Sequence, residues 1–163
     1  PQYVDMMASS IDANGGRSCI NASAIWTPKH SREIADAVAK RLAAHHALPA
    51  EDPNATLAAF ANPAVAEQIN SAIGMANREF LFPYASVVEC PESEIPNAIG
   101  QTLVATVITR NEAFIHTLMN HHNVDRLNVG CIPTWRISWD QPHEGNLFEL
   151  LYRQRALQIE PAA

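Results

Sequence analysis

The sequence has no apolar run long enough to span a bilayer, and no charged-then-apolar signal peptide opens it. Basic residues are also scarce, with 11 Lys and Arg against 17 Asp and Glu and a net charge of -6. A mildly acidic chain with scattered Lys and Arg residues lacks the basic patch that binds the phosphate backbone of a nucleic acid. These absences predict a protein that has neither a membrane nor a nucleic acid as its partner.

Cysteine occurs only three times, at Cys19, Cys90 and Cys131, and no two of these residues form a CxxC pair. A disulfide framework needs an even count and a secreted context. The odd, widely spaced set therefore indicates a reducing, cytoplasmic setting in which at most one thiol carries chemistry.

The metal-binding motif HExxH is absent, and the nearest approach to a metal site is a group of histidines. His116, His121 and His122 stand at i, i+5 and i+6, so they do not share one face of a helix. We interpret these histidines as solvent-exposed residues near the end of a helix, and we expect no metal site.

What the sequence does contain is an alternation of strand and helix patterns along 163 residues, enough for one domain with a core of its own. Such alternation predicts an α/β fold with a mostly parallel sheet flanked by helices over residues 1–163. The helix near residue 31 has Thr27 or Ser31 as its expected N-cap. Strands are predicted over residues 20–26, 80–89, 103–109, 126–132 and 157–160, and helices over residues 5–14, 31–47, 62–74, 111–122 and 148–156.

The strongest local feature is the run Asn14-Gly15-Gly16-Arg17-Ser18-Cys19. A cysteine that follows a Gly-Gly turn can be held at an exposed bend, where backbone N–H groups can point at a developing oxyanion. A nearby cation such as Arg17 favours the nucleophilic thiolate. Spacing alone still favours the alternative, in which Cys19 is an ordinary buried small residue.

This run resembles the active-site signature of the aldehyde dehydrogenase family, Asn-x-Gly-Gln-x-Cys. Asn14, Gly16 and Cys19 match the signature, and Arg17 stands where the family usually has Gln. The resemblance implies that Cys19 is the catalytic nucleophile and that Asn14 and Gly16 shape its loop. It also implies the fold of the family's catalytic domain and a small-molecule aldehyde as substrate.

Three later stretches resemble the same family in the same order. The segment from Glu79 to Pro83 is similar to Glu-x-Phe-Gly-Pro, with Leu81 and Phe82 replacing the aromatic residue and the glycine. There the resemblance implies that Glu79 contacts the ribose next to the nicotinamide. Residues 103–110 resemble the strand before the family's next helix, and residues 126–130 resemble its late Val-x-x-Asn segment. That last likeness implies that Asn128 lies on the substrate side.

The cofactor implied by the resemblance is NAD or NADP, and the sequence lacks a glycine-rich GxGxxG turn to bind it. We therefore expect the cofactor-binding domain, with the family's general-base Glu, upstream of Pro1. The implied mechanism is covalent: the Cys19 thiolate gives a thiohemiacetal, hydride passes to NAD(P), and the resulting thioester is resolved.

A second polar cluster lies in residues 139–146, where a Trp, carboxylates and His143 stand close together. His143 and Glu144 can hydrogen-bond a substrate or a neighbouring domain. The equally weighted alternative is a structural loop held on the core by Trp135 and Trp139.

Two other functions stay open. One is cofactor-free acyl transfer or thioester hydrolysis at Cys19, with His143 as the base. The other is a non-catalytic assembly domain, since several motif positions are changed. An exposed edge strand near residues 157–160, implied by the resemblance, would pair between subunits and predicts a homo-oligomer, a dimer or a tetramer.

Overall fold

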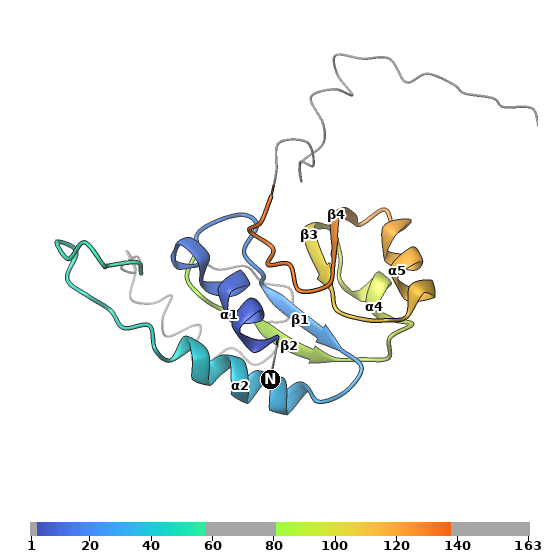
Figure 1. The fold of residues 1–163 in the computed structure, drawn as a ribbon, viewed down its shortest axis with the longest axis horizontal. Coiled ribbons are helices and arrows are strands. Elements are labelled where there is room, and N and C mark those ends of the chain that lie inside the picture. The colour runs from blue at the N-terminus through green and yellow to red at the C-terminus, as the bar shows by residue number, and fades with distance from the viewer. Residues whose placement is uncertain (1–2, 58–80, 138–163) are drawn as a thin grey trace, which may run out of the picture.

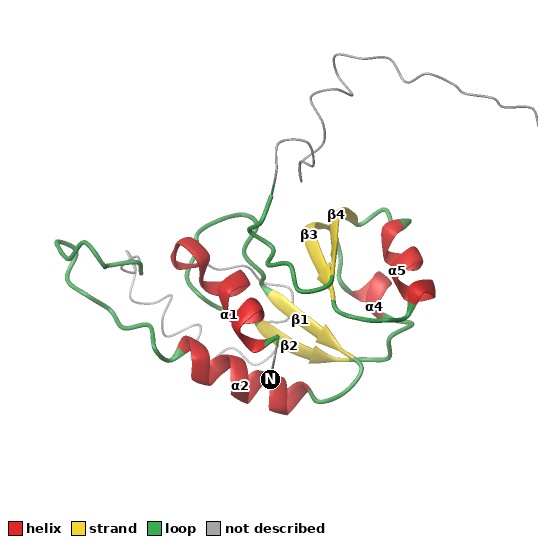
Figure 2. Ribbon diagram, viewed as in Figure 1, coloured by secondary structure: helices red, strands yellow, loops and turns green. Residues whose placement is uncertain are grey.

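The computed structural model of the chain describes residues 3–57 and 81–137. Helices and short strands alternate through these residues (Figures 1 and 2). In chain order the elements are α1 (Val4–Asp12), a 3₁₀ turn (Ala13–Gly16), β1 (Ala24–Thr27), α2 (Ser31–Leu42), β2 (Ser86–Glu89), α4 (Ile95–Ala98), β3 (Thr102–Val107), α5 (Glu112–Met119) and β4 (Val124–Val129).

The described strands form two parallel pairs rather than one sheet. β1 pairs with β2, from Ala24 opposite Ser86 to Thr27 opposite Glu89, and β3 pairs with β4. Parallel strands joined through helices confirm the α/β class, while the single sheet that we predicted is not what the described residues form. The β1–β2 ladder ends where Pro91, which has no N–H to donate, follows the last backbone bond from Cys90 to Thr27. The chain then turns away through α4.

The unit β3–α5–β4 follows the sequence pattern closely. Asn111 caps α5, since its side-chain oxygen accepts a hydrogen bond from Phe114 N at 3.3 Å. Leu118 on α5 and Val107 on β3 are buried. The predicted helix and both strands are therefore present, with ends a few residues from those predicted.

Helix α2 buries Val38 from its predicted apolar stripe and packs against α1 and β2 (Figure 1). Its predicted cap is wrong. The Thr27 hydroxyl donates to Lys29 O at 2.6 Å, and no local side chain caps the helix. Ser31 N instead donates to the Glu89 carboxylate at 3.0 Å. Register explains this: the β1–β2 ladder sets Glu89 opposite Thr27, just before the helix begins.

This long-range cap makes the stability of α2 depend on pH. Hydrogen bonds from the side chain and backbone of Ser31 hold the pKa of Glu89 below its usual value. A lowered folded pKa means that the contribution is complete above the unfolded pKa of about 4.3 and is lost as pH falls through the folded value. We expect Glu89→Gln to lower the urea midpoint slightly at pH 7 and not at pH 3, and an equal loss at both would contradict this.

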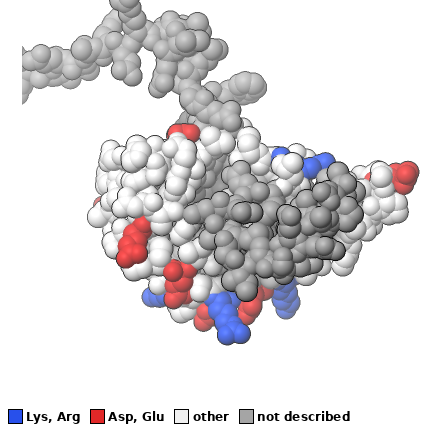
Figure 3. All heavy atoms as spheres, turned by 180° about the vertical axis from the view of Figure 1, so that it is seen from behind, with Lys and Arg blue, Asp and Glu red and all other residues white. Residues whose placement is uncertain are grey.

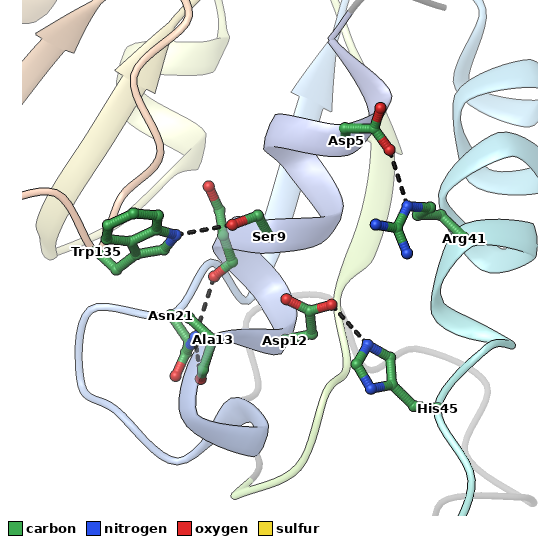
Figure 4. A network of polar contacts seen from close by, with 9 residues as sticks. Asp5, Ser9, Asp12, Ala13, Asn21, Arg41, His45 and Trp135 are labelled. Carbon is green, nitrogen blue, oxygen red and sulfur yellow. Dashed lines mark hydrogen bonds and ion pairs between the residues drawn. The ribbon is translucent and has the colours of Figure 1, made fainter. Parts of the chain in front are cut away.

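Helix α1 joins α2 to the loop that follows β4 (Figure 4). On one side, Arg41 Nε donates to Asp5 at 2.8 Å and His45 Nε2 lies 2.6 Å from Asp12 Oδ2. The contact with His45 comes beyond Leu42, where α2 ends earlier than the predicted residue 47.

On its other side, α1 bonds to the loop after β4. Trp135 Nε1 donates to Ser9 Oγ at 2.8 Å (Figure 4). The buried Thr134 N donates to Ser10 Oγ at 3.1 Å. The start of the chain and residues 134–135 are therefore held together. Trp135 is itself exposed, and Trp139 and the rest of residues 139–146 lie outside the described residues, so the structural alternative for that loop stays a prediction.

The described surface carries charges of both signs. On the face in Figure 3, Lys and Arg side chains lie among Asp and Glu side chains along the lower edge. Of the helices in the described ranges, none is both long and apolar enough to cross a bilayer.

Candidate functional site

The Gly-Gly bend predicted from the sequence is present. After α1 ends, Asn14, Gly15 and Gly16 adopt φ values of 52°, 64° and 74°, which is left-handed backbone at three consecutive residues. Glycine takes this conformation without strain and asparagine tolerates it. The bend reverses the chain so that Cys19 lies in the loop between α1 and β1.

Tertiary packing gives both glycines a second reason to lack a side chain. A Cβ on Gly16 would lie 2.5 Å from Pro83 N and 2.6 Å from Phe82 O, and a Cβ on Gly15 would overlap the backbone of Thr56. Backbone atoms cannot rotate away as a flexible side chain can. The bend is therefore the place where residues 82–83 approach the cysteine loop.

Asn21 holds the rest of the loop in place. Its side-chain oxygen accepts from Ser18 N at 2.7 Å, while its amide nitrogen donates to Ser10 O at 3.1 Å and Ala13 O at 3.0 Å. Sequence reasoning did not single out Asn21. The usable signal was an Asn three residues after a Ser in a turn, a spacing at which side chain and backbone can bond reciprocally.

Asn14 and Arg17 form a second set of contacts in the loop. Arg17 Nε donates to Asn14 O at 3.0 Å and Arg17 Nη2 donates to Asn14 Oδ1 at 3.3 Å. Asn14 Nδ2 in turn donates to Ser18 Oγ at 3.3 Å. The Asn14 side chain thus supports the residues on the N-terminal side of Cys19.

A pocket of about 380 Å³ opens beside this loop, and the exposed Cys19 forms part of its wall. Such a volume lies in the range of small-molecule sites. Part of the lining comes from a segment that begins at Leu81, sixty-two positions after Cys19. The lining residues are Ile11, Gly16, Arg17, Ser18, Cys19, Asn21, Ala22, Ser23, Leu81, Phe82 and Tyr84.

The structure brings together only some of the predicted site residues. Cys19 and Gly16 line the pocket, and Asn14 supports its loop. Within the described ranges, the wall of this pocket does not include Asn128. Asn128 is buried in β4, where it accepts from Arg126 Nε at 3.2 Å and donates to Thr106 Oγ1 at 3.3 Å. Glu79 and His143 lie outside the described residues.

The other two cysteines differ from Cys19 in a way that serves as a control. None of the three forms a disulfide; Cys131 is exposed like Cys19, and Cys90 is half-buried. Neither Cys90 nor Cys131 is among the residues that line the pocket described here. Burial, and then the Glu94 carboxylate, raise the pKa of the Cys90 thiol.

A raised pKa leaves less thiolate at a given pH, so alkylation of Cys90 should be slow and keep rising to higher pH. We expect site-resolved mass spectrometry with iodoacetamide to show the Cys90 rate still climbing above the ordinary thiol pKa of about 8.5. A Cys90 rate that levels at or below that pH would contradict this.

No known protein-family model matches the chain, and no curated protein sequence matches it either. Across the described residues, no group of three or more His, Cys, Asp or Glu side chains is placed to hold a metal ion. His121 and His122 stack on each other, with ring centroids 4.8 Å apart. The pocket beside Cys19 is therefore the candidate functional site.

Proposed function

We propose that this chain is the cysteine-bearing catalytic part of an NAD(P)-dependent aldehyde dehydrogenase, with Cys19 as its nucleophile. One observation carries the proposal: Cys19 and the segment containing Leu81 and Phe82 line the same pocket. The sequence resemblance implies that both motifs belong to one active site, with Cys19 at the aldehyde and Glu79 of the second motif at the ribose next to the nicotinamide. Their convergence in space is what that hypothesis requires.

In the proposed first step, the Cys19 thiolate attacks the aldehyde carbon. A carbon–sulfur bond forms and the π pair of the carbonyl moves to its oxygen, giving the alkoxide of a thiohemiacetal. The hydrogen bonds of Asn21 and the bend at Gly16 keep the cysteine loop in one conformation for this attack. Leu81 and Phe82 offer an apolar wall for the rest of the substrate.

The described residues do not by themselves fit the whole cofactor. A pyrophosphate group needs a glycine-rich strand-to-helix turn, and residues 28–30 and 108–111, which join β1 to α2 and β3 to α5, contain no glycine. NAD(P), when bound, supplies the hydride acceptor. In the proposal its phosphates are held outside the described residues, as is the ribose contact assigned to Glu79.

The test is site-resolved alkylation followed by an assay for turnover. A nucleophilic cysteine should react with iodoacetamide at least about tenfold faster than an ordinary exposed thiol, so Cys19 should outpace Cys131. Equal rates at these two exposed residues would sink the catalytic role of Cys19.

Turnover then separates the reaction types. NAD(P) reduction on adding an aldehyde supports the dehydrogenase, whereas thioester hydrolysis without NAD(P) would replace it with cofactor-free acyl transfer. A slow Cys19 and no turnover would favour an assembly domain. We also propose a homo-oligomer and a reducing, cytoplasmic location, in which the three cysteines stay outside disulfides.

A further inference from the structure

The pocket beside Cys19 is cationic in a chain that is acidic overall. The net charge of the chain is -6, yet the one charged side chain among the described residues of the pocket wall is Arg17. Arg17 is exposed, and a cation at the wall of a pocket attracts anionic ligands to that pocket through its Coulomb field. The charge at the described wall of the pocket is therefore opposite in sign to the net charge of the protein.

No carboxylate of the described residues neutralises Arg17. The ion pairs among the described residues join Arg41 to Asp5, His45 to Asp12 and His30 to Glu33. The hydrogen-bond partners of Arg17 are the backbone oxygen and the side-chain oxygen of Asn14, and both are uncharged.

Among the described residues, hydrogen bonds position the Arg17 guanidinium but engage only two of its N–H donors. Its Nε and Nη2 each donate once to Asn14, which fixes the plane of the group. An arginine carries five N–H donors in a rigid fork that matches a carboxylate. Two donors hold the side chain on its own loop, and three stay available to a ligand in the part of the chain described here.

We infer that Arg17 is a specificity-determining residue that selects an aldehyde bearing a carboxylate a few bonds from its carbonyl carbon. This inference rests on the proposed function, because it assumes that the carbonyl is attacked by Cys19. Only Ser18 separates Arg17 from Cys19 in sequence, so their Cα atoms lie at most about 7.6 Å apart. This short distance fits an aldehyde whose carboxylate lies a few bonds from the carbonyl carbon, rather than one in which a long chain separates the two groups.

The experiment compares two alkylating reagents at one thiol in the whole chain. Iodoacetate and iodoacetamide react identically, since the thiolate attacks the CH₂ carbon and iodide leaves, but only iodoacetate is an anion. Their rate ratio at Cys19 therefore cancels the intrinsic reactivity of the thiol. We expect Arg17→Gln to lower the iodoacetate-to-iodoacetamide ratio roughly three- to tenfold, while the ratio at Cys131 stays unchanged.

Two further arms keep the test decisive if Arg17→Gln does not fold. Arg17→Lys keeps the charge and should retain most of the ratio, and added salt should lower the ratio of the unaltered protein at Cys19 more than at Cys131. A ratio at Cys19 that ignores both Arg17→Gln and salt would overturn the inference. That result differs from failure of the proposed function, in which Cys19 reacts no faster than Cys131 with neutral iodoacetamide.

Where turnover is observed, a kinetic arm identifies the ligand class. For a carboxylate-bearing aldehyde, Arg17→Gln should raise KM by roughly tenfold, with a much smaller change for a neutral aldehyde of equal length. Equal changes for both substrates would show that Arg17 only shapes the loop through Asn14 and would also overturn the inference.

Discussion

Replacing Gly16 by alanine should lower the free energy of unfolding by roughly 2–5 kcal/mol, a large part of the total stability of a domain this size. Two effects add. A residue with a Cβ is strained by about 1–2 kcal/mol at the φ of 74° that Gly16 adopts. The new Cβ would also lie within 2.6 Å of Pro83 N and Phe82 O, so residues 82–83 must move away. Urea unfolding followed by circular dichroism measures the loss.

Gly100 provides the matched control. Its φ of 63° is also left-handed, but a Cβ there would meet nothing within 4 Å. Gly100→Ala should therefore carry only the backbone strain of about 1–2 kcal/mol. Equal losses for Gly16→Ala and Gly100→Ala would show that the close approach of Phe82 to the bend does not constrain the folded protein.

Replacing Cys19 by serine should reduce covalent chemistry at the pocket by roughly a thousandfold or more, because an unactivated hydroxyl is a far weaker nucleophile than a thiolate. Acylation by a nitrophenyl ester measures this without any cofactor. The nucleophile takes the acyl group and releases nitrophenolate, which appears as a burst. The unaltered protein should show the burst, and Cys19→Ser should not.

Cys131→Ser is the control for that experiment. Cys131 is exposed and outside any disulfide, as Cys19 is, but it does not belong to the described lining of the pocket. The variant should therefore keep the burst and the site of acylation at Cys19. A burst that survives in Cys19→Ser and disappears in Cys131→Ser would move the nucleophile to the loop after β4 and refute the proposed site.

The local part of the site could be predicted because it depends on neighbouring residues. Consecutive glycines indicated a bend, and the structure has left-handed backbone at Gly15 and Gly16. The exposure of Cys19 contradicts the buried alternative that spacing alone favoured. Asn21 was missed because its role depends on the carbonyl oxygens of Ser10 and Ala13, which an alternation pattern does not locate.

In the fold, too, the features set by neighbouring residues were predicted and those set by long-range contacts were not. The helix over Ser31–Leu42 and the unit β3–α5–β4 were predicted in kind because hydrophobic periodicity is a local signal. The cap of α2 was predicted wrongly because its partner, Glu89, stands 58 residues further along the chain and arrives only through the β1–β2 register.

Local sequence signals account for the acidic balance of charge, the glycine bend before Cys19 and most of the described helices and strands. Each of these depends on composition or on residues a few positions apart. Long-range packing places Phe82 against Gly16, puts Arg17 in the pocket wall, and buries Asn128 in β4 away from the pocket lining. Packing joins segments that no short-range preference connects, so the pocket exists only once the chain has folded.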